Sequence, residues 1–231
     1  MNDIKVIGFD ADDTLWVNET FFRETEQQFA NLLKAYAEPD EAYRLLYKVE
    51  VANMSIYGYG IKAFVLSLIE TANLISGFRI TARETDQIIQ LGKEMLNKPV
   101  ELLDGVEEVL QKLHGRYRLI VATKGDLLDQ ERKLKKSGLL DYFHHIEVMS
   151  DKTPETYKNL IHHLDIQPDQ FLMIGNSMKS DILPVIELGG YGIHVPFHTT
   201  WHHEVVTESV DSDNFKEVKS LKEVLPLMAK I

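Results

Sequence analysis

The sequence predicts an α/β fold, a doubly wound parallel sheet with an all-helical domain inserted after its first strand. Short apolar runs alternate with stretches of helical periodicity over most of the 231 residues. Residues 19–99 break this alternation, because they show helical periodicity and contain no convincing strand. Strands that alternate with helices form a parallel sheet with helices on both faces.

Five apolar runs are expected to form the strands, each bounded by polar or turn residues. They are residues 4–9, 118–122, 145–149, 171–174 and 192–195. Helices are expected at residues 127–138, 156–164 and 182–188, and Gly138 is a typical C-terminal stop for the first of them. The acidic segment ESVDSDNFKEV, residues 208–218, is interpreted as a solvated connection to a final helix.

The helical stretch predicts two domains. Residues 1–17 and 100–231 are assigned to an α/β core domain, and residues 18–99 to an inserted helical cap domain. The insert begins at the C-terminal end of the first strand, which is where open α/β sheets bind ligands. We therefore expect it to act as a lid over a ligand site.

Composition and charge narrow the possible functions. The formal net charge of −11 argues against nucleic-acid binding as the main activity. The absence of cysteine excludes disulfide scaffolds, thiolate zinc sites and cysteine nucleophiles. No apolar run approaches the roughly 20 residues that span a bilayer, and the N-terminus lacks the pattern of a secretory signal. We expect a cytoplasmic monomer or homodimer that binds neither nucleic acid nor membranes.

The first strand ends on a cluster of carboxylates. In KVIGFDADDTLW, residues 5–16, the apolar run is followed by Asp10, Asp12 and Asp13. Two unit charges about 4 Å apart repel by roughly 4 kcal/mol at an effective dielectric constant near 20. Such crowding is tolerated where the charges diverge into water or where a cation lies between them. Alternatively, Asp12 and Asp13 cap the following helix or form a turn.

The later strands also end on polar residues. The second is followed by Thr123 and Lys124, the third by Lys152, and the fourth by Asn176 and Asp181. Because parallel strands end at the same edge of a sheet, these side chains and the aspartates are expected in one crevice. Carboxylate and amide oxygens suit Mg²⁺, whereas a hydroxyl, a lysine and helix N-termini suit a phosphate. The pattern therefore predicts a small-molecule phosphorylated substrate.

Two of the aspartates suit covalent phosphoryl transfer. Asp10 is a candidate carboxylate nucleophile towards phosphorus. Asp12, two residues later, points to another side of the extended chain and is a candidate general acid and base.

Together these residues resemble the four motifs of the haloacid dehalogenase-like (HAD) phosphohydrolases. The resemblance lies in DxDxT at residues 10–14, Thr123 at a strand end, Lys152 before a proline, and GNSxxxD at residues 175–181. It implies a Rossmann-like core with a C1-type cap. It also implies a Mg²⁺-dependent phosphatase, similar to nucleotidase-like and flavin mononucleotide phosphatase-like members that act on small metabolites.

The resemblance further implies roles for single residues. Asp10 would form an aspartyl-phosphate and bind Mg²⁺. Asp12 would protonate the leaving oxygen, then activate water, and its backbone carbonyl would bind the metal. The phosphoryl group would be held by Thr123 and by the N–H of Lys124, and Lys152 would offset charge near Asp10.

Two positions depart from the family pattern. Asn176 stands where an aspartate is usual, so the metal shell would be completed by its amide oxygen and by Asp181. The site then loses one negative charge, and weaker metal binding is expected. Lys124 stands where many relatives carry asparagine, and its charge would partly compensate at the phosphate pocket.

Two further clusters are candidate binding residues. In MSIYGYGIKAF, two glycines interrupt a helical stretch and expose Tyr57, Tyr59 and Lys62. In a C1-type cap these residues would contact the leaving group, and a packed helix–helix turn is the alternative. The segment HTTWHHE contains His198, His202 and His203. His198 and His202 are four residues apart, a spacing that is found in zinc sites on helices. No helical face is evident here, so a loop beside the fifth strand is the preferred interpretation.

Other functions remain as alternatives. A phosphomutase uses the same two aspartates, and a non-catalytic phosphate-ligand sensor or regulatory protein is favoured only by Asn176. Haloacid dehalogenases lack an acid at the second motif position, so Asp12 argues against dehalogenation. Phosphonate hydrolysis would require an imine-forming lysine in the cap, for which no motif is present.

Overall fold

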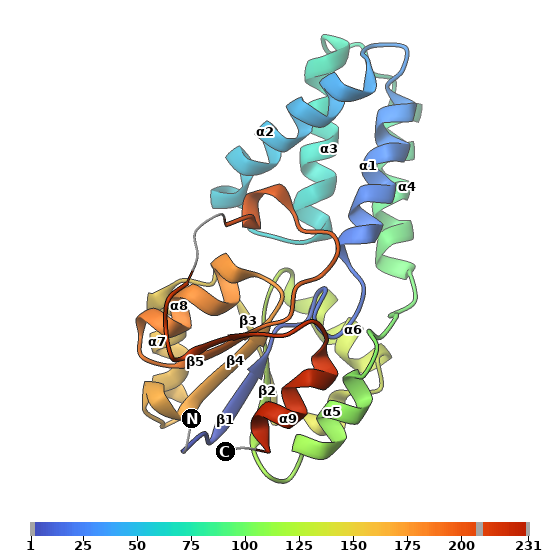
Figure 1. The fold of residues 1–231 in the computed structure, drawn as a ribbon. Coiled ribbons are helices and arrows are strands. Elements are labelled where there is room, and N and C mark those ends of the chain that lie inside the picture. Colours follow the sequence, from blue (N-terminus) through green and yellow to red (C-terminus); the bar gives the residue numbers. More distant parts are fainter. Residues whose placement is uncertain (1–2, 207–209, 230–231) are drawn as a thin grey trace. The chain divides into compact units, whose positions relative to one another are not determined.

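A computed structural model describes residues 3–206 and 210–229 (Figure 1). The chain divides into two compact units. The sheet unit consists of Met1–Glu19, Val100–Lys124 and Gln130–Ile231, and the helical unit consists of Thr20–Pro99 and Gly125–Asp129. None of the helices within the described residues is both long and apolar enough to cross a membrane.

The sheet unit is built on six parallel strands in the order β3-β2-β1-β4-β5-β6. Their bounds are β1 Val6–Phe9, β2 Arg118–Lys124, β3 His145–Met149, β4 Phe171–Gly175, β5 Tyr191–His194 and β6 Phe215–Glu217. The predicted α/β parallel sheet is thus confirmed. The order places β1 between β2 and β4, so the residues that follow these three strands meet at the centre of one sheet edge.

Helices cover both faces of the sheet because successive residues of each strand point to opposite faces. Ile7 and Phe9 of β1 belong to one core, and Val6 belongs to the other. The first core includes residues of α5 (Val106–Leu113), α6 (Leu127–Lys136) and α9 (Val224–Met228). The second includes residues of α7 (Pro154–His163) and α8 (Leu183–Glu187). Figure 1 shows these two groups of helices on opposite sides of the strands.

The sequence interpretation of residues 208–218 needs a correction. Residues 208 and 209 lie outside the described part of the chain, but Phe215–Glu217 forms β6 and pairs with β5. This edge strand has only three residues, and Lys216 and Glu217 are exposed, so it has no apolar run that periodicity could detect. The helix expected at residues 182–188 is also longer, because a π-helix, η3 (Met178–Ile182), leads into α8.

The helical unit contains four helices and its own core. They are α1 Glu19–Leu32, which starts in the sheet unit, α2 Pro39–Tyr57, α3 Ile61–Ser76 and α4 Ala82–Asn97. Phe29, Leu68 and Ile88 are fully buried in this core. A capping box starts α4, in which Thr81 Oγ1 accepts from the N–H of Glu84 and the Glu84 carboxylate accepts from the N–H of Thr81.

Candidate active site

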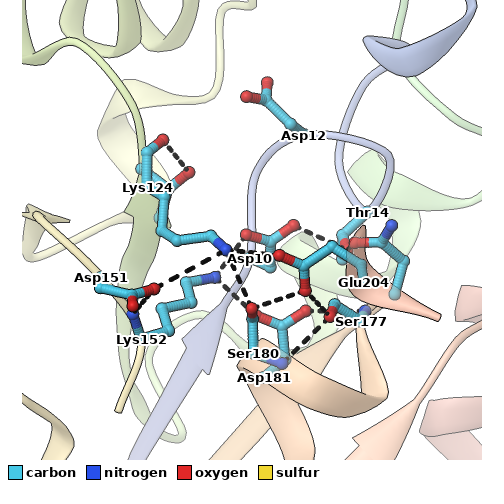
Figure 2. Close-up of polar contacts among 12 residues, drawn as sticks. Asp10, Asp12, Thr14, Lys124, Asp151, Lys152, Ser177, Ser180, Asp181 and Glu204 are labelled. Atoms are coloured by element: carbon cyan, nitrogen blue, oxygen red, sulfur yellow. Dashed lines mark hydrogen bonds and ion pairs between the residues drawn. The ribbon is translucent and has the colours of Figure 1, made fainter. Parts of the chain in front are cut away.

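Asp10 lies directly after β1, and its N–H donates to the carbonyl of Ile174 on β4 at 2.9 Å. The residue is 7% exposed. Its Oδ1 accepts from Lys152 Nζ at 2.6 Å and its Oδ2 accepts from Thr14 Oγ1 at 3.2 Å (Figure 2). Burial raises the pKa of Asp10 to about 7, with Lys152 opposing the rise and Asp181 adding to it. The side chain is thus a buried carboxyl group that needs a cation to stay charged at neutral pH.

Lys152 supplies one such cation. It precedes α7, and its side chain is 1% exposed. Its Nζ donates to Asp10 Oδ1 at 2.6 Å and to Asp181 Oδ1 at 2.5 Å. Burial alone would lower the pKa of Lys152, but these two carboxylates raise it well above its usual value of 10.5. Lys152 is therefore a permanent positive charge between two buried acids.

Asp181 is fixed from two directions. Besides its contact with Lys152, its Oδ2 accepts from the N–H of Ser177 at 2.9 Å. The backbone of Gly175, the last residue of β4, passes so close that a Cβ there would lie 2.2 Å from Asp181 Oδ2. The glycine of the GNSxxxD segment therefore makes room for the carboxylate six residues later.

This close approach predicts that Gly175→Ala destabilises the protein by about 1–3 kcal/mol, because the methyl group must displace the Asp181 carboxylate or the strand. Urea unfolding measures the loss. Gly115→Ala is the matched control: Gly115 has a φ of 80°, and a Cβ added there would have no other atom within 4 Å, so only backbone strain of about 1 kcal/mol is expected. Equal stability of Gly175→Ala and the wild type would contradict the packing argument.

Asp12 lies on the same loop and has different partners. Its Oδ1 accepts from Trp16 Nε1 at 2.7 Å and from Lys133 Nζ at 2.8 Å. Its Oδ2 accepts from Gln130 Nε2 at 2.8 Å. The side chain is 23% exposed, so it reaches water while three donors fix its position.

Asp13 has a structural role, in agreement with the alternative interpretation that it forms a turn and caps the following helix. Its φ of 61° turns the chain, and its carboxylate accepts from the N–H groups of Asn18 and Glu19 at the start of α1. Burial raises the pKa of Asp13 to about 7, although both N–H groups oppose the rise. The residue therefore anchors the first turn of α1.

Asn176 forms an oxygen-rich cluster with the Asp10 loop. Its side-chain amide lies 3.2 Å from the carbonyl of Asp12, from Thr14 Oγ1 and from Asp10 Oδ2. With the amide nitrogen turned inward, Asn176 donates to these atoms. With the oxygen turned inward, it meets the carbonyl and carboxylate oxygens directly, and a hard cation between them would offset their repulsion. The donor set of Asp10, the Asp12 carbonyl and Asn176 therefore fits Mg²⁺.

Thr123 and Lys124 end β2 at the same edge. Thr123 is 1% exposed, and its Oγ1 lies 3.4 Å from Gln130 Nε2. The Lys124 ammonium donates to Ser180 Oγ at 2.9 Å and to Glu204 Oε1 at 2.6 Å. The charge of Lys124 is thus already matched by a carboxylate, one that the sequence did not single out.

The structure therefore brings one group of the predicted residues together within the sheet unit. The group that meets at the sheet edge comprises Asp10, Asp12, Thr123, Lys124, Lys152, Asn176 and Asp181. The cap candidates lie in the helical unit, where Tyr57 is 49% exposed, Tyr59 is half-buried and Lys62 Nζ donates to Asp126 at 2.9 Å. Their contact with a substrate stays a prediction.

The histidine segment follows β5 as a loop with one short 3₁₀ helix, η4 (His202–Glu204), as preferred from the sequence. The rings of His198 and Phe197 pack with centroids 4.0 Å apart, and His203 Nε2 lies 3.1 Å from Lys179 Nζ. Over residues 3–206 and 210–229, no three His, Asp or Glu side chains are grouped to hold a metal.

Three residues of the site were missed by sequence reasoning: Gln130, Lys133 and Glu204. Gln130 and Lys133 lie within the helix expected at residues 127–138, and Glu204 lies in the segment interpreted as a loop. Their partners are 118, 121 and 80 residues away in the sequence, so no local signal marks them.

Comparisons with known proteins identify the family and the fold of the chain. A family model for haloacid dehalogenase-like hydrolases matches residues 4–189. The chain is 38% identical to a haloacid dehalogenase-like family hydrolase from Xanthomonas campestris, with a TM-score of 0.88, covering 99% of this chain and 93% of that one. No curated protein matches the chain.

Two more distant structures share the fold. The HAD hydrolase YfnB from Bacillus subtilis, solved with bound magnesium, is 16% identical and has a TM-score of 0.67, covering 98% of this chain and 99% of that one. L-2-haloacid dehalogenase from Xanthobacter autotrophicus, with chloropropionic acid covalently bound, is 12% identical and has a TM-score of 0.69, covering 99% of each chain. At these identities the two structures show the fold alone, and a fold does not determine the reaction.

Proposed function

Because the chain belongs to the haloacid dehalogenase-like hydrolase family, we propose that it hydrolyses the phosphate monoester of a small metabolite with the help of Mg²⁺. The candidate substrates are nucleotides, flavin mononucleotide and sugar phosphates. The observation that carries the proposal is the pair of acids on the loop after β1. Asp10 is buried against Lys152, whereas Asp12 reaches water, so the two carboxylates suit different tasks.

In this reaction the Asp10 carboxylate attacks phosphorus and forms an aspartyl-phosphate, and the ester oxygen departs. Asp12 gives a proton to that oxygen and then takes one from the water that attacks the intermediate. The transferring group is held by the Thr123 hydroxyl and the N–H of Lys124. Lys152 offsets the charge of Asp10, so that the phosphate dianion can approach it.

Mg²⁺ fits the oxygen cluster of Asp10, the Asp12 carbonyl and Asn176, and when bound it supplies charge neutralisation for the phosphate oxygens. Asp181 has both oxygens engaged by Lys152 and Ser177. We therefore infer that Asp181 supports the metal site through its charge and through water. The amide of Asn176 leaves the site less negative than a third carboxylate would, so a modest metal affinity is expected.

The test is a comparison of two leaving groups. Phosphate release is measured on nucleotides, flavin mononucleotide and sugar phosphates, and halide release on 2-chloropropionate, each with Mg²⁺ and with a chelator. We expect phosphate release that requires Mg²⁺ and no halide release. Halide release without phosphate release would overturn the proposal in favour of dehalogenation. If neither product forms while phosphate compounds still bind, the protein is a sensor, the alternative that Asn176 favours.

A further inference from the structure

Glu204 brings a carboxylate into the sheet unit from η4, in the loop after β5. Its side chain is 11% exposed. Lys124 Nζ donates to its Oε1 at 2.6 Å. The hydroxyls of Ser177 and Ser180 donate to its Oε2 at 2.5 Å and 2.6 Å (Figure 2). One ammonium and two hydroxyl groups therefore surround a single carboxylate, and we name these three side chains the anion pocket.

The anion pocket suits a permanent negative charge. Burial alone would raise the pKa of Glu204, but the ion pair with Lys124 and the hydrogen bonds from Ser177 and Ser180 outweigh burial and lower it to about 2. The Lys124 side chain is 14% exposed, so solvent screens the ion pair only partly. Hydrogen bonds to a charged acceptor are stronger than those between neutral groups, so Glu204 is held firmly in the anion pocket.

A chain of contacts connects the anion pocket with Asp10. Ser177, which binds Glu204 through its hydroxyl, donates its N–H to Asp181 Oδ2 at 2.9 Å. Asp181 in turn shares the Lys152 ammonium with Asp10. Figure 2 shows these side chains as one polar cluster. A ligand bound at Asp10 would therefore have the anion pocket beside it.

We propose that Glu204 determines specificity by filling the anion pocket, so that the site rejects substrates with a second anionic group. The inference rests on the proposed function, since it assumes a phosphate monoester at Asp10. A carboxylate or second phosphate on the leaving group would meet the Glu204 carboxylate instead of the Lys124 ammonium. A neutral alcohol, such as a sugar or nucleoside hydroxyl, meets no such repulsion. The substrate class is therefore a monophosphate with an uncharged leaving group.

The test compares the binding of two ligands by calorimetry in the presence of a chelator, so that no turnover interferes. 2-Phosphoglycolate carries a carboxylate beside its phosphate, and ethyl phosphate does not. Glu204→Ala and Glu204→Gln are each expected to bind 2-phosphoglycolate at least tenfold more tightly than the wild type. Binding of ethyl phosphate should change less than threefold. Adding Lys124→Met to Glu204→Ala should remove the gain in affinity, because the Lys124 ammonium is its source.

Glu108→Gln is the matched control, because Glu108 also pairs with a lysine at 2.6 Å but its side chain on α5 is 47% exposed. This variant should change the affinity for neither ligand. If Glu204→Ala fails to fold, Glu204→Gln carries the test, since its amide oxygen still accepts from the serines. The proposal is overturned if the Glu204 variants change the affinity for both ligands equally, or change neither affinity. This measurement involves no catalysis, so it is independent of the proposed function. If the wild type releases phosphate but the Glu204 variants leave the relative affinities for the two ligands unchanged, only the role of Glu204 is overturned.

Discussion

Asp10→Asn is expected to lose phosphate release by roughly 10⁴-fold or more, as when a nucleophile is removed, without losing stability at pH 8. In the folded protein without metal, the pKa of Asp10 is raised from 3.8 to about 7. Between these values the folded state binds a proton that the unfolded chain does not, so stability falls as pH rises. Each pKa unit corresponds to about 1.4 kcal/mol, so the fall is on the order of 4 kcal/mol. A neutral asparagine at position 10 avoids this loss of stability.

Urea unfolding at pH 5 and pH 8, with a chelator present, measures this difference, and phosphate release is assayed in parallel. Asp13→Asn is the matched control, because burial also raises the pKa of Asp13 to about 7, while the residue only anchors α1. It should flatten the pH dependence of stability in the same direction and keep activity within about tenfold of the wild type. If Asp10→Asn remained active, another group would be the nucleophile.

The sequence was sufficient to predict the features of this site that are local in the chain. An apolar run that ends on Asp10 and Asp12 is visible within a dozen residues, and periodicity identified five of the six strands. Parallel strands end at one edge, so the convergence of Thr123, Lys152 and Asn176 followed from topology alone. The roles of these residues stay predictions, because geometry places a side chain without measuring its reaction.

The parts that could not be predicted depend on long-range contacts. Nothing near Glu204 indicates that it pairs with Lys124, 80 residues earlier. The expected charge compensation by Lys124 is changed by this contact, because Glu204 offsets the added positive charge. In the same way, β6 is recognisable only once β5 offers it a partner, since an exposed three-residue edge strand carries no periodic pattern.

Lys152→Met should have the opposite effect on stability to Asp10→Asn. The ammonium lies 2.6 Å from Asp10 Oδ1 and 2.5 Å from Asp181 Oδ1, and its side chain is 1% exposed. Removing it leaves two buried carboxylates without their cation, a change that typically costs about 3–5 kcal/mol. The pKa of Asp10 would rise further, because Lys152 lowers it in the wild type. Stability of the variant should therefore fall more steeply with rising pH than that of the wild type.

Urea unfolding at pH 5.5 and pH 8 measures both the loss and its slope. Lys133→Met is the matched control, because Lys133 also binds a site carboxylate, Asp12, at 2.8 Å, but its side chain is 17% exposed. It should cost only about 1 kcal/mol. The double variant Lys152→Met/Asp181→Asn should recover part of the loss, since one of the two buried charges is then removed.

The outcome also bears on the proposed chemistry. A large loss that grows with pH means that Asp10 is charged beside Lys152 in the wild type, as an attacking carboxylate requires. If Lys152→Met instead matched the wild type at pH 8, Asp10 would already be protonated in the metal-free protein. That result would contradict a pKa of about 7 for Asp10, because the charged carboxylate that attacks phosphorus would then be absent at neutral pH.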